Sequence, residues 1–138
     1  MKILNIVPTK FIKEFDNHDG PHMLFAHLVE VDSEYVDSYK SMKGLKIMDN
    51  SWWELRRDLP VKELVEKCWV IKADVLVLPD IFYSTDFYKK VENCVKQVRN
   101  IDKNLKLMGV VKGYSMEDEL ETFKYFNQNP EISHIAIP

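Results

Sequence analysis

Short apolar runs, each ended by a polar residue or a proline, recur along the chain and predict buried β-strands. These runs are Ile3–Val7, Leu45–Met48, Val75–Leu78, Leu107–Val111 and His134–Ile137. Near-continuous apolar runs of this length are typical of parallel strands that are covered on both faces of a sheet. The segment Pro21–Val29 is also apolar, and its pattern does not distinguish a strand from a helix.

Amphipathic segments between these runs predict helices, because their apolar residues recur with helical spacing. The expected starts are Asp32 or Ser33, Asp58–Pro60, Ser84 or Thr85, and the capping-box sequence at Ser115. Strands that alternate with helices predict an α/β fold with a parallel sheet and right-handed crossovers, as a single domain over residues 1–138. Two architectures fit: a complete doubly wound sheet, or the first five strands of a TIM barrel, which needs about 250 residues.

The composition restricts the class of protein. Of the 138 residues, 46% are hydrophobic and 30% charged, which predicts a folded domain, and the net charge of −3 argues against tight unaided binding of nucleic acid. No stretch approaches the roughly 20 apolar residues of a membrane span, and the run at Met1–Asn5 is too short for a signal peptide. Cys68 and Cys94 lie on apolar helix faces as expected for reduced core thiols, so we expect a cytoplasmic protein.

No familiar cofactor or metal motif is present. The sequence has no P-loop, Gly-rich dinucleotide fingerprint, nucleophile elbow or zinc ribbon, and we expect no cofactor. The loop from His18 to His22 has two histidines near Asp19, but their spacing matches no metal signature, so no metal site is expected. His27, inside an apolar run, is expected to be a core histidine with a hydrogen-bond partner.

Polar residues that directly follow the predicted strands are candidate site residues, because active sites of parallel α/β folds form at the carboxyl ends of strands. Asp49 follows the second strand and is a candidate general acid or base, although Asp in such a turn also hydrogen-bonds its own loop. Trp52 is a candidate for stacking on a base or for core packing. Glu54 is a candidate second carboxylate or a solvated surface group.

Two further strand ends carry candidates. Asp80 is either a turn residue or a carboxylate that accepts two hydrogen bonds from N1–H and the exocyclic amine of guanine. Lys112, followed by Gly113, is either a phosphate or ring-oxygen contact or a surface lysine.

Five segments together carry a resemblance to a known family. They are Phe25–Leu28, Met48–Asn50 with Glu54, Ala73–Asp80, Val110–Gly113 and Ile132–Pro138. In order and spacing they resemble the tRNA-guanine transglycosylase superfamily, and most of all the phage and bacterial branch that inserts 7-deazaguanine bases into DNA. The resemblance covers nearly the whole chain.

The resemblance implies a TIM barrel that exchanges guanine for a deazaguanine base through a covalent glycosyl–aspartate intermediate. It implies proton handling by Asp49, binding of the guanine edge by Asp80, and reading of the guanine carbonyl at Gly113, with Asn50, Trp52, Glu54 and Lys112 as further binding residues. The sequence departs from the family where Lys112 replaces a common Gln, and where Ser51–Trp52 replaces small residues.

The chain is expected to carry only the base-recognition half of such a site. In the family, the nucleophilic aspartate and the zinc-binding cluster lie beyond the fifth strand, so we expect no transglycosylation by this chain alone. The implied partners are guanine or a deazaguanine base, nucleic acid through a complete assembly, and a second copy or partner chain that completes the barrel. The alternatives are a non-catalytic base-binding module, a protein-interaction module, and a glycosidase that pairs Asp49 with Asp80.

Overall fold

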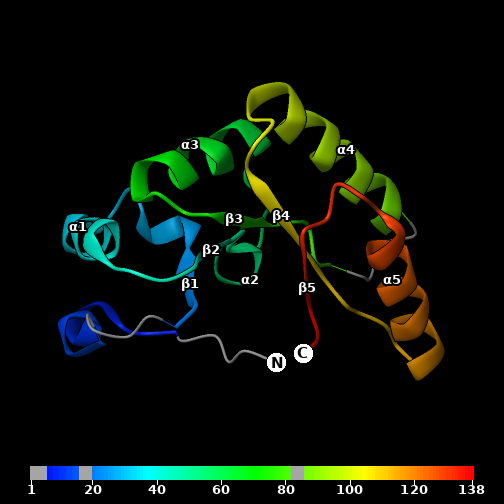
Figure 1. Ribbon diagram of the computed structural model, residues 1–138, viewed down its shortest axis with the longest axis horizontal. Coiled ribbons are helices and arrows are strands. Elements are labelled where there is room, and N and C mark those ends of the chain that lie inside the picture. The colour runs from blue at the N-terminus through cyan, green and yellow to red at the C-terminus, as the bar shows by residue number, and fades with distance from the viewer. Residues whose placement is uncertain (1–5, 16–19, 82–85) are drawn as a thin grey trace. The chain divides into compact units, whose positions relative to one another are not determined.

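The chain alternates strands and helices, as Figure 1 shows, and the computed structural model describes residues 6–15, 20–81 and 86–138. Its strands are β1 (His22–Phe25), β2 (Lys46–Asp49), β3 (Val75–Val77), β4 (Lys106–Val110) and β5 (His134–Ala136). Its α-helices are α1 (Ser33–Ser41), α2 (Trp52–Leu55), α3 (Val61–Ile71), α4 (Phe87–Ile101) and α5 (Met116–Gln128). Two 3₁₀ segments, η1 (Thr9–Phe15) and η2 (Ala26–Leu28), lie on either side of β1.

The sheet is parallel, which confirms the predicted α/β class. Phe25 pairs with Asp49, Met48 with Leu76, and Gly109 with Ile135. The strand order is β1-β2-β3-β4-β5. This uninterrupted order is that of successive TIM-barrel strands, whereas a doubly wound sheet reverses direction at a switch point.

The predicted strand Ile3–Val7 is not found at the two of its residues that the structure describes. Ile6 and Val7 are not in a strand, and residues 3–5 lie outside the described residues. Among the described residues, the first strand is β1, which lies within the apolar segment that the pattern left undecided. Its His22 N–H donates to the Leu45 carbonyl at 2.8 Å. Val7 is buried without strand pairing, and the following Pro8 has no N–H for a ladder. Of these two apolar residues only Val7 is buried, because Ile6 is 60% exposed.

The chain consists of two compact units, residues 1–76 and 77–138. In the first unit, Tyr35 and Tyr39 of α1 are fully buried with ring centroids 4.8 Å apart, and the Tyr35 hydroxyl accepts a hydrogen bond from the Phe25 N–H at 2.8 Å. The Asp32 side chain caps α1 by accepting from the Tyr35 N–H, as predicted. Helix α3 begins directly after Pro60, also as predicted.

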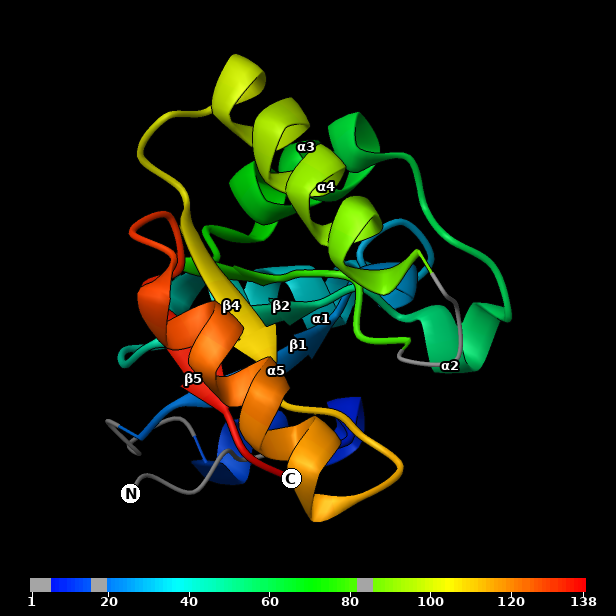
Figure 2. The same ribbon diagram turned by 90° about the vertical axis from the view of Figure 1, so that its right-hand side faces the viewer.

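In the second unit, α5 packs on β4 (Figure 2). The close approach depends on Gly109, because a Cβ at that position would lie 2.5 Å from the Phe126 ring. The predicted capping box is present, with the Ser115 hydroxyl accepting from the Asp118 N–H and the Asp118 carboxylate accepting from the Ser115 N–H. The expected cap of α4 at Ser84 or Thr85 lies outside the described residues.

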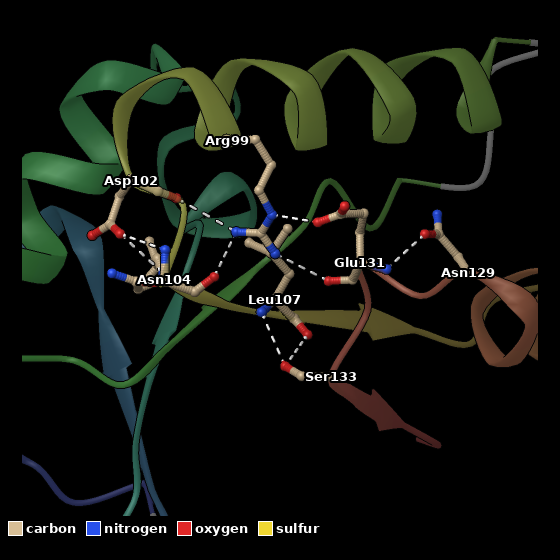
Figure 3. A network of polar contacts seen from close by, with 8 residues as sticks. Arg99, Asp102, Asn104, Leu107, Asn129, Glu131 and Ser133 are labelled. Carbon is tan, nitrogen blue, oxygen red and sulfur yellow. Dashed lines mark hydrogen bonds and ion pairs between the residues drawn. The ribbon is translucent and has the colours of Figure 1, made fainter.

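A polar network closes the amino ends of β4 and β5 (Figure 3). The Arg99 guanidinium donates to the Leu105 carbonyl at 2.8 Å, to the Glu131 carbonyl at 3.2 Å and to the Glu131 carboxylate. The Ser133 hydroxyl donates to the Leu107 carbonyl at 2.9 Å. These contacts hold the loops at the amino ends of the strands together, which indicates a structural role for this end of the sheet. A functional site is therefore expected at the carboxyl ends of the strands.

Candidate functional site

The loop after β2 is held by its own polar side chains. The Asp49 carboxylate accepts from the Ser51 N–H at 2.7 Å, and the Asn50 side-chain oxygen accepts from the Trp52 N–H at 2.9 Å. Both contacts are local turns of the kind that Asp and Asn favour. Asp49 therefore stabilises its own turn, which is the structural alternative given for it in the sequence analysis. Proton transfer by Asp49 stays a prediction.

Ser51 is the residue of this loop that the sequence analysis missed. It is fully buried and left-handed, with φ 56° and ψ 25°, although it is not glycine. Its hydroxyl oxygen accepts from the His27 N–H at 3.2 Å and lies 3.0 Å from His27 Nδ1. These contacts join the segment after β1 to the loop after β2. They give half-buried His27 a hydrogen-bond partner, as expected.

The short helix α2 carries an aromatic and cationic group. Trp52 is half-buried and Trp53 is 66% exposed, with ring centroids 6.3 Å apart. The Arg56 guanidinium lies 3.9 Å from the Trp53 ring centroid, a cation–π distance. Glu54 is exposed, which matches the solvated alternative for that residue. Base contacts by Trp52, Glu54 and Asn50 stay predictions.

In the second unit, Asp80 and Lys112 lie together. The Lys112 ammonium is 3.7 Å from an Asp80 carboxylate oxygen, and the two side chains are 37% and 27% exposed. Asp80 follows β3 and Lys112 follows β4, and the Leu78 N–H donates to the Met108 carbonyl at 3.0 Å. The strand ladder therefore brings these two predicted residues to one place at the carboxyl ends of the strands.

The backbone next to Lys112 is fastened to the start of α5. The Thr122 hydroxyl donates to the Lys112 carbonyl at 2.8 Å, and the Tyr114 N–H donates to the Asp118 carboxylate at 3.1 Å. A Cβ at Gly113 would lie 2.6 Å from the Glu119 nitrogen, so the close approach requires glycine. Packing against α5 therefore explains why residue 113 is a glycine. Recognition of a guanine carbonyl at Gly113 stays a prediction.

The Asp80–Lys112 pair has a definite chemical capacity. The carboxylate only accepts hydrogen bonds and the ammonium only donates them, and the two charges balance. Such a pair complements the edge of a neutral ligand that carries two adjacent hydrogen-bond donors, which face the carboxylate, and one acceptor, which faces the ammonium. The remaining exposure of both side chains leaves them accessible to such a ligand.

No protein-family model and no curated protein matches the chain. The family resemblance therefore depends on the quoted residues alone. Within residues 6–15, 20–81 and 86–138, no group of three or more His, Cys, Asp or Glu side chains is placed to hold a metal ion. His18 lies outside the described residues. Over the same part of the chain, no helix has the length and apolar character needed to cross a membrane.

Proposed function

We propose that Asp80 and Lys112 bind the edge of a guanine or 7-deazaguanine base, and that the chain contributes the base-recognition half of a base-exchanging transglycosylase that acts on DNA or tRNA. The observation that carries the proposal is the 3.7 Å approach of the Lys112 ammonium to the Asp80 carboxylate at the ends of neighbouring strands. The resemblance of the five quoted segments to the guanine transglycosylases supports the same function.

The hydrogen-bonding pattern of guanine fits this pair. Guanine presents its exocyclic amine and N1–H as donors beside its O6 acceptor. The Asp80 carboxylate accepts from the two donors, and the Lys112 ammonium donates to O6. Lysine in place of the family's glutamine keeps a donor opposite O6 and removes the acceptor, so it disfavours adenine, which has an amine at that position.

Catalysis requires groups beyond this pair. Asp49 is the proposed proton-handling residue, and the nucleophile of a covalent exchange would come from residues or a partner chain that complete the barrel. The buried thiols of Cys68 and Cys94 support a reducing compartment such as the cytoplasm, which would be the host cytoplasm for a phage protein.

A second function has one observation in its favour. The Asp49 carboxylate is engaged by the Ser51 N–H at 2.7 Å, a role that fits a scaffold better than a mobile proton carrier. The alternative is therefore a base-binding module without catalysis. It predicts guanine binding that persists when Asp49 is replaced by Asn.

Thermal unfolding with added bases tests the proposed recognition, because a ligand that binds only the native state stabilises it. Guanine and 7-deazaguanine should raise the Tm, hypoxanthine should do so less because it lacks the amine, and adenine should have no effect. Asp80→Asn should abolish the shift, because an amide nitrogen replaces one acceptor, and Lys112→Met should weaken it.

Lys62→Met is the matched control. Lys62 lies 3.8 Å from the Glu66 carboxylate on the surface of α3, so this change removes a similar ion pair and the same charge. The control should keep the full guanine shift. An equal shift in the parent chain and Asp80→Asn would contradict base binding at this pair.

A further inference from the structure

Ser51 and His27 form a hydrogen-bonded pair whose proton arrangement follows from burial. Ser51 is fully buried, and its hydroxyl oxygen accepts from the His27 N–H at 3.2 Å and lies 3.0 Å from His27 Nδ1. A buried hydroxyl hydrogen needs an acceptor, and within residues 6–15, 20–81 and 86–138 the only hydrogen-bond partner of this hydroxyl is His27. The hydroxyl therefore donates to Nδ1, and the neutral imidazole carries its own hydrogen on Nε2.

Protonation of His27 would take the acceptor away from this buried hydroxyl. Both ring nitrogens of an imidazolium are donors, so Nδ1 could no longer accept the Ser51 hydrogen. A second serine–histidine contact in the chain lacks this property. The Ser133 hydroxyl lies 2.9 Å from His134 Nδ1 but also donates to the Leu107 carbonyl at 2.9 Å, so protonation of His134 leaves the serine hydrogen with an acceptor.

The Ser51–His27 pair holds the loop after β2. Ser51 has φ 56° although it is not glycine, and such a conformation persists only where surrounding contacts hold it. Its N–H donates to the Asp49 carboxylate at 2.7 Å, and α2 begins at the next residue, Trp52. Loss of the contact with His27 would therefore release both the Asp49 carboxylate and the start of α2.

The charged groups around His27 allow it to take up a proton. The segment η2, which contains His27, packs on α3. The Lys67 ammonium of α3 lies 2.8 Å from the Glu30 carboxylate and 3.4 Å from that of Glu63, so two anions balance this cation. The exposed Arg56 guanidinium lies over the Trp53 ring. Other titratable groups on the flanking elements are Asp49, His22, Glu54 and the exposed pair Lys62–Glu66.

We propose that the Ser51–His27 pair is a pH-sensitive latch, which is closed while His27 is neutral and opens when His27 takes up a proton. Histidine is the side chain that ordinarily changes its charge between about pH 5 and 8, so mild acid shifts the loop toward its open state. In that state the Ser51 N–H no longer donates to Asp49. The latch operates without any ligand, and only its effect on proton handling by Asp49 rests on the proposed function.

Native-state hydrogen exchange tests the latch, because the Ser51 N–H exchanges when the loop opens. Its protection factor, measured by NMR on the parent chain at about pH 8 and at about pH 5.5, should fall roughly tenfold in acid, as expected for the loss of one hydrogen bond. His27→Asn should abolish this dependence on pH, because its side-chain oxygen accepts the Ser51 hydroxyl hydrogen and takes up no proton. Ser51→Gly, which lacks the hydroxyl, should give an amide of equal and low protection at both pH values.

Two controls separate the latch from a general effect of acid. His134→Asn replaces the histidine whose serine partner has a second acceptor, and this variant should keep the full acid-induced loss at Ser51. The Leu64 N–H, which donates to the Pro60 carbonyl at the start of α3, should keep its protection in the parent chain. Equal protection of the Ser51 N–H at both pH values in the parent, or an acid-induced loss that persists in His27→Asn, would overturn the proposal. Because no base is added, a failure of guanine binding at Asp80 and Lys112 would leave this result unchanged.

Discussion

The hydroxyl of Thr122, which is fully buried in α5, donates to the carbonyl of Lys112 at 2.8 Å, so a helix residue holds the backbone of the lysine that meets Asp80. The same hydroxyl is 2.9 Å from the Asp118 carbonyl, and its one hydrogen is shared between the two acceptors. The geometry of the candidate base site therefore depends on a residue that would not touch the base.

Thr122→Val should lower the free energy of unfolding by about 1 kcal/mol, the usual contribution of one such hydrogen bond. Because Lys112 would lose its anchor, the guanine-dependent Tm shift should fall as well. Urea unfolding measures the first effect, and thermal unfolding with guanine measures the second.

Ser41→Ala serves as the control for this change. The Ser41 hydroxyl also donates to backbone carbonyls of its own helix, at 2.8 Å to Ser38, but it is exposed. Its removal should change stability by a few tenths of a kcal/mol at most. An unchanged guanine shift in Thr122→Val would show that Lys112 needs no anchor from α5.

Ser51 combines a buried hydroxyl with a left-handed backbone, and two substitutions separate these features. Ser51→Ala should cost about 1–2 kcal/mol, because the His27 N–H loses its acceptor. Ser51→Gly loses the same hydroxyl but adopts φ 56° without steric cost, so it should be less damaging by up to about 1 kcal/mol. Urea unfolding of both variants measures the difference. A glycine variant less stable than the alanine variant would mean that the left-handed conformation carries little strain.

Gly109 should be intolerant of a side chain. The added Cβ of Gly109→Ala would lie 2.5 Å from the Phe126 ring, and overpacking of this kind costs about 1–3 kcal/mol. Truncation of the ring in a Gly109→Ala, Phe126→Leu double variant should recover part of that loss, which a double-mutant cycle in urea would detect. Gly113→Ala meets the backbone nitrogen of Glu119, so no single side-chain truncation should rescue it. Additive effects at 109 and 126 would show that α5 moves to accommodate the methyl group.

The fold was more predictable from the sequence than the site. Apolar runs placed β2 to β5. For β2, β3 and β4 the reason is burial, because a strand buried on both faces must be apolar along its length, whereas β5 is only half-buried. The same signal predicted a strand that ends at Val7, which is apolar and buried but is not in a strand. The Asp32 cap and the Ser115 capping box were predicted because a cap depends on a few adjacent residues.

At the site, the position of Asp80 and Lys112 after strands was enough to predict them as candidates. Their contact, however, depends on how the strands pair, and a sequence pattern does not give the distance between residues on neighbouring strands. The roles of Ser51 and Thr122 were not predicted, because a positive φ at serine and a hydroxyl aimed at a carbonyl ten residues earlier leave no periodic pattern.

The stability of the chain should respond to alkaline pH in two opposite ways. Burial lowers the pKa of Lys46 below its usual 10.5, with Lys72 adding to the shift and Asp74 opposing it. The unfolded chain then binds more protons than the native chain just below pH 10.5, so the contribution of Lys46 to stability rises with pH in that window. Burial raises the pKa values of Tyr35 and Tyr39 above 10, so their contribution falls once unfolded tyrosines ionise.

Lys46→Met isolates the lysine effect. Urea unfolding of parent and variant from about pH 7 to about pH 10.5 should show a stability difference that changes in favour of the parent as the pH rises, because the neutral amine no longer opposes burial. Lys62→Met, at an exposed lysine, should show no such trend. In a parallel absorbance titration of the native chain, Tyr35 and Tyr39 should still be protonated at about pH 10. They should ionise to phenolates only when the chain unfolds. A constant difference between parent and Lys46→Met across this range would contradict the lowered pKa of Lys46.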